Sequence, residues 1–363
     1  MKMRLPTIVS LLMLLASGSS LAADSLRDQA KGLFEAIPLA PPALPGDAAT
    51  PEKLTLGKML YFDPRISENH DINCNTCHNI SMGGVGGPAT TRGHTGELGG
   101  RNVLTVLNAV FNKAQFWDGR AADLKEQVVS GVMANPAALL KSRGGPIISD
   151  SAANNLTKQH VVEQLKTIPG YVDAFKKAFP SESDPIVYDN IGRAIALFEA
   201  TLITPDAPFD RWLNGDDNAL SENEKAGLKV FIDKGCSNCH NGINIGGGTF
   251  ARFGTVQSPG PELLPSDDWG RFAVTKNVAD KYVFKVPSLR NFELIAPYFH
   301  TGPNFDQRKV VAIMGASQLD QKLSDGEIDK ILAFLNSLTG RQPEVVLPIL
   351  PPTGNGGASR PSP

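Results

Sequence analysis

Two copies of the motif Cys-x-x-Cys-His constrain this chain more than any other feature of its sequence. They occupy residues 74–78 and 236–240 and together contain all four cysteines. In such a motif two thiols can add to the vinyl groups of a haem, and the histidine then supplies an axial nitrogen to the iron. The sequence therefore predicts two covalent c-type haems, with attachment and proximal ligation by Cys74, Cys77, His78, Cys236, Cys239 and His240.

Three other uses of paired cysteines fit the sequence less well. A four-cysteine zinc site would need only the two Cys-x-x-Cys pairs, so a histidine directly after each pair would be a coincidence. A thioredoxin-like redox pair normally lies at a strand-to-helix turn, and no such pattern flanks either motif. Structural disulfides are also disfavoured, because Cys-x-x-Cys bridges are strained and a chain of 363 residues does not need them to fold.

The first 23 residues have the pattern of a secretory signal peptide. Lys2 and Arg4 form a basic end, residues 8–15 are nearly all apolar, and Ser20-Leu21-Ala22 resembles a cleavage site. The apolar run is shorter than the roughly 20 residues that span a bilayer, and no other stretch approaches that length. We therefore expect a periplasmic protein without a membrane span, since bacteria attach haem covalently outside the cytoplasm.

Chain length and the separation of the motifs predict two domains, each with one haem. We expect a signal peptide at 1–23, an N-terminal haem domain at 24–203, a C-terminal haem domain at 204–341 and a proline-rich tail at 342–363. The tail is expected to be extended or disordered. A formal net charge of -2 and a pI near 6.3 give no basic footprint for nucleic acid.

Helical signals dominate the sequence between the motifs and after them. Thr50 and Pro51 suit the N-cap and first position of a helix, and Ser221 and Ser324 each open a capping box. Further helical spacing covers 161–179, broken at Pro169-Gly170, and 191–203, while 103–111 could be a short helix and 83–100 a glycine-rich loop. Strand-like alternation is scarce, so we expect a mainly α fold of two cytochrome-c-like domains, each around one haem.

The second axial ligand decides what each haem can do. His94 is the best candidate at the first haem because it lies in the glycine-rich loop, from which a ligand can swing away; an ordinary solvated histidine is the alternative. Met314 is the candidate at the second haem because it lies downstream of the second motif and before the final helix. A thioether ligand raises the potential of a haem, although most methionines only pack in cores.

Several longer stretches resemble the bacterial dihaem cytochrome c peroxidases. The segment 108–120 ends in Phe-Trp-Asp-Gly-Arg, and 296–300 reads Ala-Pro-Tyr-Phe-His. Other matching stretches are Gly93-His94, Arg101-Asn102, 123–127, 270–276, 289–291 and 312–315. The resemblance extends in order from about residue 50 to residue 345, nearly the whole mature chain.

The resemblance implies a role for each matching residue. His78 would hold a low-potential peroxidatic haem with His94 as a displaceable ligand, and His240 and Met314 would hold a high-potential electron-transfer haem. Trp117 would lie between the haems, although it could also be an ordinary core aromatic. Phe116 and Gln127 would line the peroxide pocket. A calcium site would be built from oxygen donors, namely Asn102 and the backbone carbonyls of Ile295 and Pro297.

One departure from the family concerns the acid–base residue. The family carries a glutamate shortly after the matching glutamine, but here no glutamate occurs between Glu126 and Glu163. The family position falls on Ala138 or Ala152, depending on the direction of alignment. Asp150 is the only carboxylate in this interval, and we take it as the candidate proton donor, with a turn or N-cap residue as the alternative.

These expectations combine into a peroxidase that reduces hydrogen peroxide to water. Electrons would come from a small periplasmic cytochrome c or copper protein, and the resemblance implies a homodimer. Two alternatives stay open. A maturation oxidase of the same superfamily would have tyrosine where Met314 stands, and a non-enzymatic dihaem electron carrier is compatible with the missing glutamate.

Overall fold

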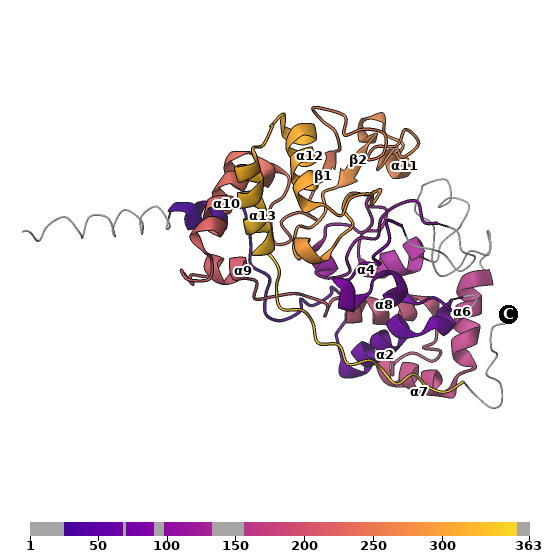
Figure 1. Ribbon diagram of the computed structural model, residues 1–363. Coiled ribbons are helices and arrows are strands. Elements are labelled where there is room, and N and C mark those ends of the chain that lie inside the picture. Colours follow the sequence, from indigo (N-terminus) through magenta and orange to yellow (C-terminus); the bar gives the residue numbers. More distant parts are fainter. Residues whose placement is uncertain (1–24, 68–69, 91–97, 133–155, 354–363) are drawn as a thin grey trace, which may run out of the picture.

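Helices form most of the regular secondary structure in this computed structural model, which describes residues 25–67, 70–90, 98–132 and 156–353 (Figure 1). Several expectations lie outside these residues, namely the signal peptide, His94, Asp150 and the last ten residues of the tail. The two described strands, β1 (Phe250–Arg252) and β2 (Val283–Lys285), form one antiparallel pair in which Phe250 faces Lys285. The expected mainly α fold is confirmed.

The first motif lies among helices of the N-terminal half, and the second lies among helices of the C-terminal half (Figure 1). The N-terminal group consists of α2 (Pro51–Phe62), α3 (Cys74–Cys77), α4 (Leu124–Glu126), α6 (Leu156–Lys166), α7 (Pro169–Ala178) and α8 (Tyr188–Glu199). The C-terminal group consists of α9 (Pro208–Leu213), α10 (Glu222–Asp233), α11 (Phe272–Thr275), α12 (Gln307–Leu319) and α13 (Asp325–Asn336). Single turns of 3₁₀-helix connect many of them, and residues 127–132 form a π-helical turn.

Most helix starts follow from local sequence chemistry. The Thr50 hydroxyl accepts a hydrogen bond from the backbone N–H of Lys53, and both Ser221 and Ser324 complete reciprocal capping boxes. Pro169 begins α7 and thereby separates it from α6, as the break in the helical spacing predicts. The possible helix over 103–111 is wrong except for a 3₁₀ turn at Ala109–Phe111, because Asn108 takes a positive φ of 59°.

Each half is built on a pair of helices that cross at a glycine. A Cβ atom added to Gly57 of α2 would lie 1.8 Å from the carbonyl oxygen of Ala194 on α8. In the other half, a Cβ atom added to Gly227 of α10 would lie 1.9 Å from the carbonyl oxygen of Lys330 on α13. Only glycine permits backbones to approach this closely, so these residues fix where the helix pairs cross.

Two large apolar cores form around these helix pairs, and the ends of the chain exchange between them. Ala30 and Phe34, which lie before α2 and within the expected N-terminal domain, pack in the core of the C-terminal half with Phe209 and Trp212. Val345 of the tail packs against the N-terminal core instead. The extended tail can be followed in Figure 1 from α13 back along α2 and α7. The domain limits at 24–203 and 204–341 stay a prediction. The packing shows in addition that a segment near each end of the chain contacts the core of the other half.

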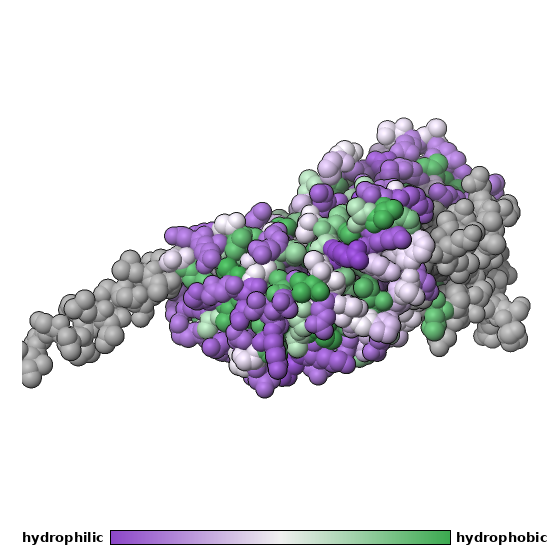
Figure 2. Space-filling model, turned by 90° about the horizontal axis from the view of Figure 1, so that it is seen from above, coloured by the Kyte–Doolittle hydropathy of each residue, from purple (hydrophilic) through white to green (hydrophobic). Residues whose placement is uncertain are grey.

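Polar residues alternate with small apolar patches on the surface seen in Figure 2. Within the part of the chain that the structure describes, no helix has both the length and the apolar character needed to cross a membrane.

Candidate functional site

The first Cys-x-x-Cys-His motif forms a short helix whose ends are fixed by side chains. Asn73 caps α3, because its side chain accepts from the backbone N–H of Thr76 while the Thr76 hydroxyl accepts from the backbone N–H of Asn73. His78 follows directly, with Nδ1 lying 3.0 Å from the carbonyl oxygen of Leu104. The Tyr61 hydroxyl donates to the carbonyl oxygen of His78 over 2.7 Å. This orientation leaves Nε2 of His78 available for a metal.

The cysteines and histidine of this N-terminal pocket are in the chemical state that a haem needs. Cys74 and Cys77 form no disulfide, and burial raises the pKa of the Cys74 thiol. Burial also lowers the pKa of His78 to about 4, so its ring is neutral at pH 7 and can act as a ligand. Among the described residues, no three His, Cys, Asp or Glu side chains cluster as a metal site, which removes support for a four-cysteine zinc centre.

In the second motif, as in the first, a backbone carbonyl orients the histidine, but different secondary structure holds the motif. Helix α10 ends at Asp233, and a 3₁₀ turn at Cys236–Asn238 carries the first cysteine of the motif. Nδ1 of His240 lies 3.3 Å from the carbonyl oxygen of Ile245, and burial lowers the pKa of His240 to about 4. Burial also raises the pKa of Cys236 to about 11. His240 is therefore a second neutral, oriented imidazole beside two free thiols.

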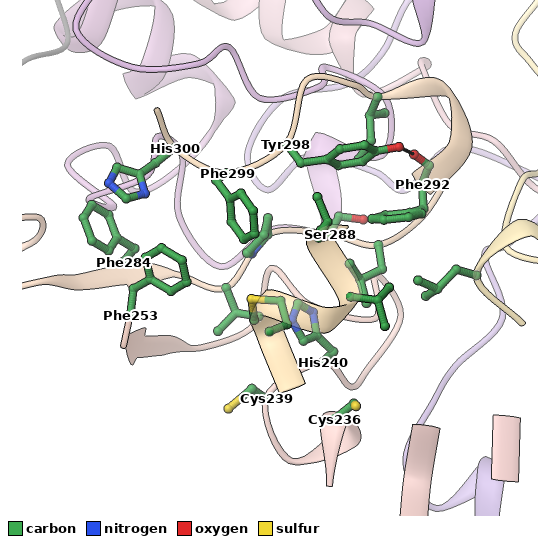
Figure 3. Close-up of a pocket in the computed structure, with 18 of the residues that line it drawn as sticks. Cys236, Cys239, His240, Phe253, Phe284, Ser288, Phe292, Tyr298, Phe299 and His300 are labelled. Atoms are coloured by element: carbon green, nitrogen blue, oxygen red, sulfur yellow. Dashed lines mark hydrogen bonds between the residues drawn. The ribbon is translucent and has the colours of Figure 1, made fainter. Parts of the chain in front are cut away.

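These residues line a cavity of about 210 Å³ in the C-terminal half (Figure 3). Met314 of α12 lines the same cavity as His240, so folding brings the two expected ligands of the second haem together. Aromatic rings form much of the remaining wall, contributed by Phe253, Phe284, Phe292, Tyr298 and Phe299. Two thiols, an imidazole, a thioether and apolar walls are the donor set and surroundings of a covalent His/Met haem, and this C-terminal pocket fits one.

A buried carboxylic acid distinguishes the N-terminal pocket. Glu199, at the end of α8, is 3% exposed, and its Oε2 accepts no hydrogen bond from the described residues. Burial raises its pKa to about 8. Burial raises the pKa of Cys74 and of Tyr61, and the nearby carboxylate of Glu199 adds to both shifts. The sequence analysis missed Glu199, although an acid directly after the apolar run 194–198 is a signal that could have identified it.

Trp117 is a buried residue in the wall of the cavity that His240 and Met314 line. It is 8% exposed, and its indole N–H donates to the carbonyl oxygen of Asn102 over 2.9 Å. The apolar cluster that contains Trp117 also contains Leu104, whose carbonyl orients His78, and Met314 from the C-terminal pocket. One side chain thus packs between a residue that positions the first motif and a candidate ligand of the second haem.

A network of buried charges holds the segment around Trp117 against the C-terminal half. Arg101 pairs with Asp118 at 2.8 Å and with Asp268 at 2.6 Å, and all three side chains are at most 5% exposed. Arg271 donates to the carbonyl oxygen of Asp118 over 2.9 Å. Arg101, Asp118 and Arg271 stand in stretches that carry the family resemblance, but no sequence pattern pairs them, because the partners lie far apart along the chain.

The residues expected to bind calcium lie close together. The Asn102 side-chain amide is 2.5 Å from the carbonyl oxygen of Pro297, and Asn102, Ile295 and Pro297 all line the cavity of the C-terminal pocket. In the present rotamer the amide nitrogen of Asn102 faces Pro297, so a bound cation would require the amide to turn its oxygen inward.

Phe116 and Gln127 lie in the N-terminal half but outside this cavity. Phe116 takes a positive φ of 67°, and the Arg120 guanidinium lies 3.7 Å from the centre of its ring. Gln127 begins the π-helical turn after α4. Their expected partners His94 and Asp150 lie outside the described residues, so the arrangement of a peroxide pocket stays a prediction.

Known proteins match this chain over most of its length. A model of the family described as di-haem cytochrome c peroxidase matches residues 51–218. The cytochrome c551 peroxidase of Pseudomonas aeruginosa is 49% identical over 340 residues, which cover 93% of this chain and 94% of that protein. The cytochrome c551 peroxidase of Nitrosomonas europaea is 45% identical over 317 residues, covering 86% and 89%.

A solved structure adds a match in three dimensions. It is the crystal structure of a MauG-like protein associated with microbial copper homeostasis, with a TM-score of 0.70 and 25% identity over 84% of this chain and 93% of that chain. Because sequence identity of 49% extends over nearly the full length, the chain belongs to the di-haem cytochrome c peroxidase family.

Proposed function

We propose that this protein reduces hydrogen peroxide to water with two c-type haems and electrons from a small partner protein. The observation that carries the proposal is the packing of one buried tryptophan, Trp117, in a cluster with Leu104, whose carbonyl orients His78, and with Met314, which lines the same cavity as His240. The cavity that His240 lines is also lined by a methionine, Met314. A methionine ligand at one haem would suit a division of labour between an electron-accepting haem and a peroxide-binding haem, and the two cytochrome c551 peroxidases among the relatives are named for peroxidase activity.

The chain's own residues would hold the cofactors and move protons. Haem, when bound, supplies the redox-active iron at each site. His78 and His240 would be the proximal ligands, and the backbone carbonyls of Leu104 and Ile245 orient them by accepting from Nδ1. His94 would occupy the second axial position of the first haem and leave it on reduction. Phe116 and Gln127 would border the peroxide, with Asp150 as the candidate donor of a proton to the leaving oxygen.

A calcium ion between the two halves is part of the proposal. Asn102 follows Arg101, whose ion pairs join the two halves, while Ile295 and Pro297 belong to the C-terminal half. Oxygen ligands from these three residues would connect the region of the first haem to the wall of the second pocket. Addition of calcium to chelated protein should therefore change the spectrum of the first haem.

The surroundings of the protein are proposed on the same basis. Residues 1–23 would direct export to the periplasm, where a small cytochrome c or a copper protein would donate electrons near the second haem. The two haem domains would comprise 24–203 and 204–341, the tail would join them, and the protein would form a homodimer.

Two other functions remain to be tested against this one. A non-enzymatic electron carrier would keep both irons six-coordinate, and the absence of a glutamate between Glu126 and Glu163 is the feature that favours it. A maturation oxidase is disfavoured because such a protein would have a tyrosine at the position of Met314, which lines the C-terminal pocket.

The optical spectrum of the half-reduced protein distinguishes the proposals. We expect a high-spin signal from the first haem when the second is reduced, followed by rapid turnover with peroxide. In a His94→Gly variant the first haem should bind cyanide even in the fully oxidised protein. A low-spin spectrum throughout, with no peroxide turnover before or after reduction, would identify an electron carrier.

A further inference from the structure

Lys285, the last residue of β2, is a buried cation in the wall of the C-terminal pocket. Its side chain is 2% exposed and lines the same cavity as His240 and Met314. No carboxylate of the described residues lies within ion-pair distance of it; the neighbouring Arg101, in contrast, pairs with both Asp118 and Asp268. Burying an ammonium group without an anion is costly, and burial lowers the pKa of Lys285 to about 8.

The composition of the cavity wall makes this lysine exceptional. Within the described part of the chain, Lys285 is the one lysine or arginine among the lining residues, and no aspartate or glutamate lines the cavity. The other titratable groups that share the space are Cys236 and Cys239, which are assigned to the haem vinyl groups, His240, which is assigned to the iron, the phenol of Tyr298, and His300, which stacks on Phe284 with ring centres 4.2 Å apart. A haem carries two propionate carboxylates at the edge opposite its vinyl groups, and they need a counter-charge when buried.

We propose that Lys285 binds a propionate of the C-terminal haem and sets the potential of that haem. The cation supplies the charge that the propionate needs, and the propionate supplies the anion that the buried lysine lacks. The backbone N–H of Lys285 donates to the carbonyl oxygen of Trp117 over 2.7 Å. This bond fixes the backbone of Lys285 against Trp117, which lines the same cavity. The inference rests on the haem assignment and does not require peroxide reduction.

The test is a potentiometric titration of the purified holoprotein at several pH values, with haem content measured first. Lys285→Met should lower the potential of the C-terminal haem, because loss of a nearby positive charge favours Fe(III). Without the lysine, the propionate should also take up a proton on reduction, so the potential should fall as pH rises. Lys285→Arg, which keeps the positive charge, should retain the parental potential and show a smaller dependence on pH than Lys285→Met.

Two further variants control for a general effect of removing a surface charge and for poor haem incorporation. Lys276→Met removes an exposed lysine of the same half and should leave both potentials unchanged. If Lys285→Met does not accumulate with two haems, Lys285→Gln retains the length and polarity of the side chain and serves in the same titration. A fully loaded Lys285→Met or Lys285→Gln protein with the parental potential at every pH would overturn the inference. None of these readouts uses peroxide, so they remain valid if the proposed activity fails.

Discussion

Helices α2 and α8 cross at Gly57 in the N-terminal half, just as α10 and α13 cross at Gly227 in the C-terminal half. Gly57 faces the carbonyl oxygen of Ala194 and the Cβ atom of Phe198, and Gly227 faces the carbonyl oxygen of Lys330 and the Cβ atom of Phe334. In both pairs the phenylalanine follows the residue with that carbonyl by four positions. The residue after that phenylalanine differs. It is Glu199 in the N-terminal half and Leu335, a lining residue of the cavity, in the C-terminal half.

This difference shows how one frame can hold two unlike haems. The shared parts are the crossing glycine, the Cys-x-x-Cys-His motif and a backbone carbonyl that orients the histidine. The parts that differ are the charges and ligands around the iron. A buried acid next to the first haem would favour Fe(III), whereas the thioether of Met314 and the cation of Lys285 would favour Fe(II) at the second. Variants that exchange these features test the comparison.

Replacing the methionine ligand should have the largest effect. In Met314→His an imidazole would take the place of the thioether, and imidazole favours Fe(III). We expect the potential of the second haem to fall and peroxide turnover to be lost, with haem content unchanged. Potentiometric titration and steady-state turnover are the measurements. An unaltered high-potential wave would remove Met314 from the ligand set.

Replacing the candidate proton donor Asp150 should have the second-largest effect, and this effect should be confined to the first haem. If Asp150 serves only the first haem, Asp150→Asn should slow peroxide turnover by roughly 10²–10⁴-fold while both haem spectra stay normal. The rate of electron delivery to the second haem, measured by stopped flow, should not change. Turnover within about twofold of the parent would make Asp150 a structural residue.

Replacing either crossing glycine should destabilise the protein by a similar amount. Gly57→Ala and Gly227→Ala each place a methyl group within 2 Å of a backbone oxygen, so the helices must move apart. We expect each change to lower the free energy of unfolding by about 1–3 kcal/mol. Denaturant titration of the holoproteins measures it, with Gly326→Ala on α13, where the added methyl meets nothing within 4 Å, as the control. A tolerated Gly57→Ala would show that the two frames are not equivalent.

Making the first pocket resemble the second should produce a smaller change. Glu199→Leu introduces the residue type found at Leu335, and it should raise the potential of the first haem above about pH 8, where Glu199 is charged. Below this pH the parent and the variant should converge. Potentials that differ equally at all pH values would assign the effect to packing and not to the carboxylate.

Glu199 should also make the free energy of unfolding depend on pH. The pKa of Glu199 is raised from 4.5 to about 8 by folding, so the folded protein holds this proton more tightly than the unfolded chain. Its contribution to stability is therefore complete below about pH 4.5 and is lost as pH rises to about 8. Unfolding curves of the parent should show this loss, on the order of a few kcal/mol, and those of Glu199→Gln should not.

Local patterns allowed several parts of the structure to be predicted from the sequence. Caps at Thr50, Ser221 and Ser324 act within a few residues of themselves, and each begins a helix where expected. The attachment motifs are local too, because cysteine spacing and the adjacent histidine are sufficient to identify a haem site. The 103–111 segment was predicted less well, since apolar character alone did not reveal the positive φ of Asn108.

The sequence by itself therefore determined the mainly α class and the family, and it predicted the two haem-attachment sites, their proximal histidines and the candidate ligand Met314. Only the tertiary structure decided what surrounds those sites. Glu199 and Arg101 interact with residues that lie far away in the chain, and Lys285 lines a cavity together with distant segments. The energies of all three depend on burial that no local pattern records. An ammonium or carboxyl group becomes a determinant of haem chemistry only when folding removes the water around it, since desolvation magnifies its interaction with the charge on the iron.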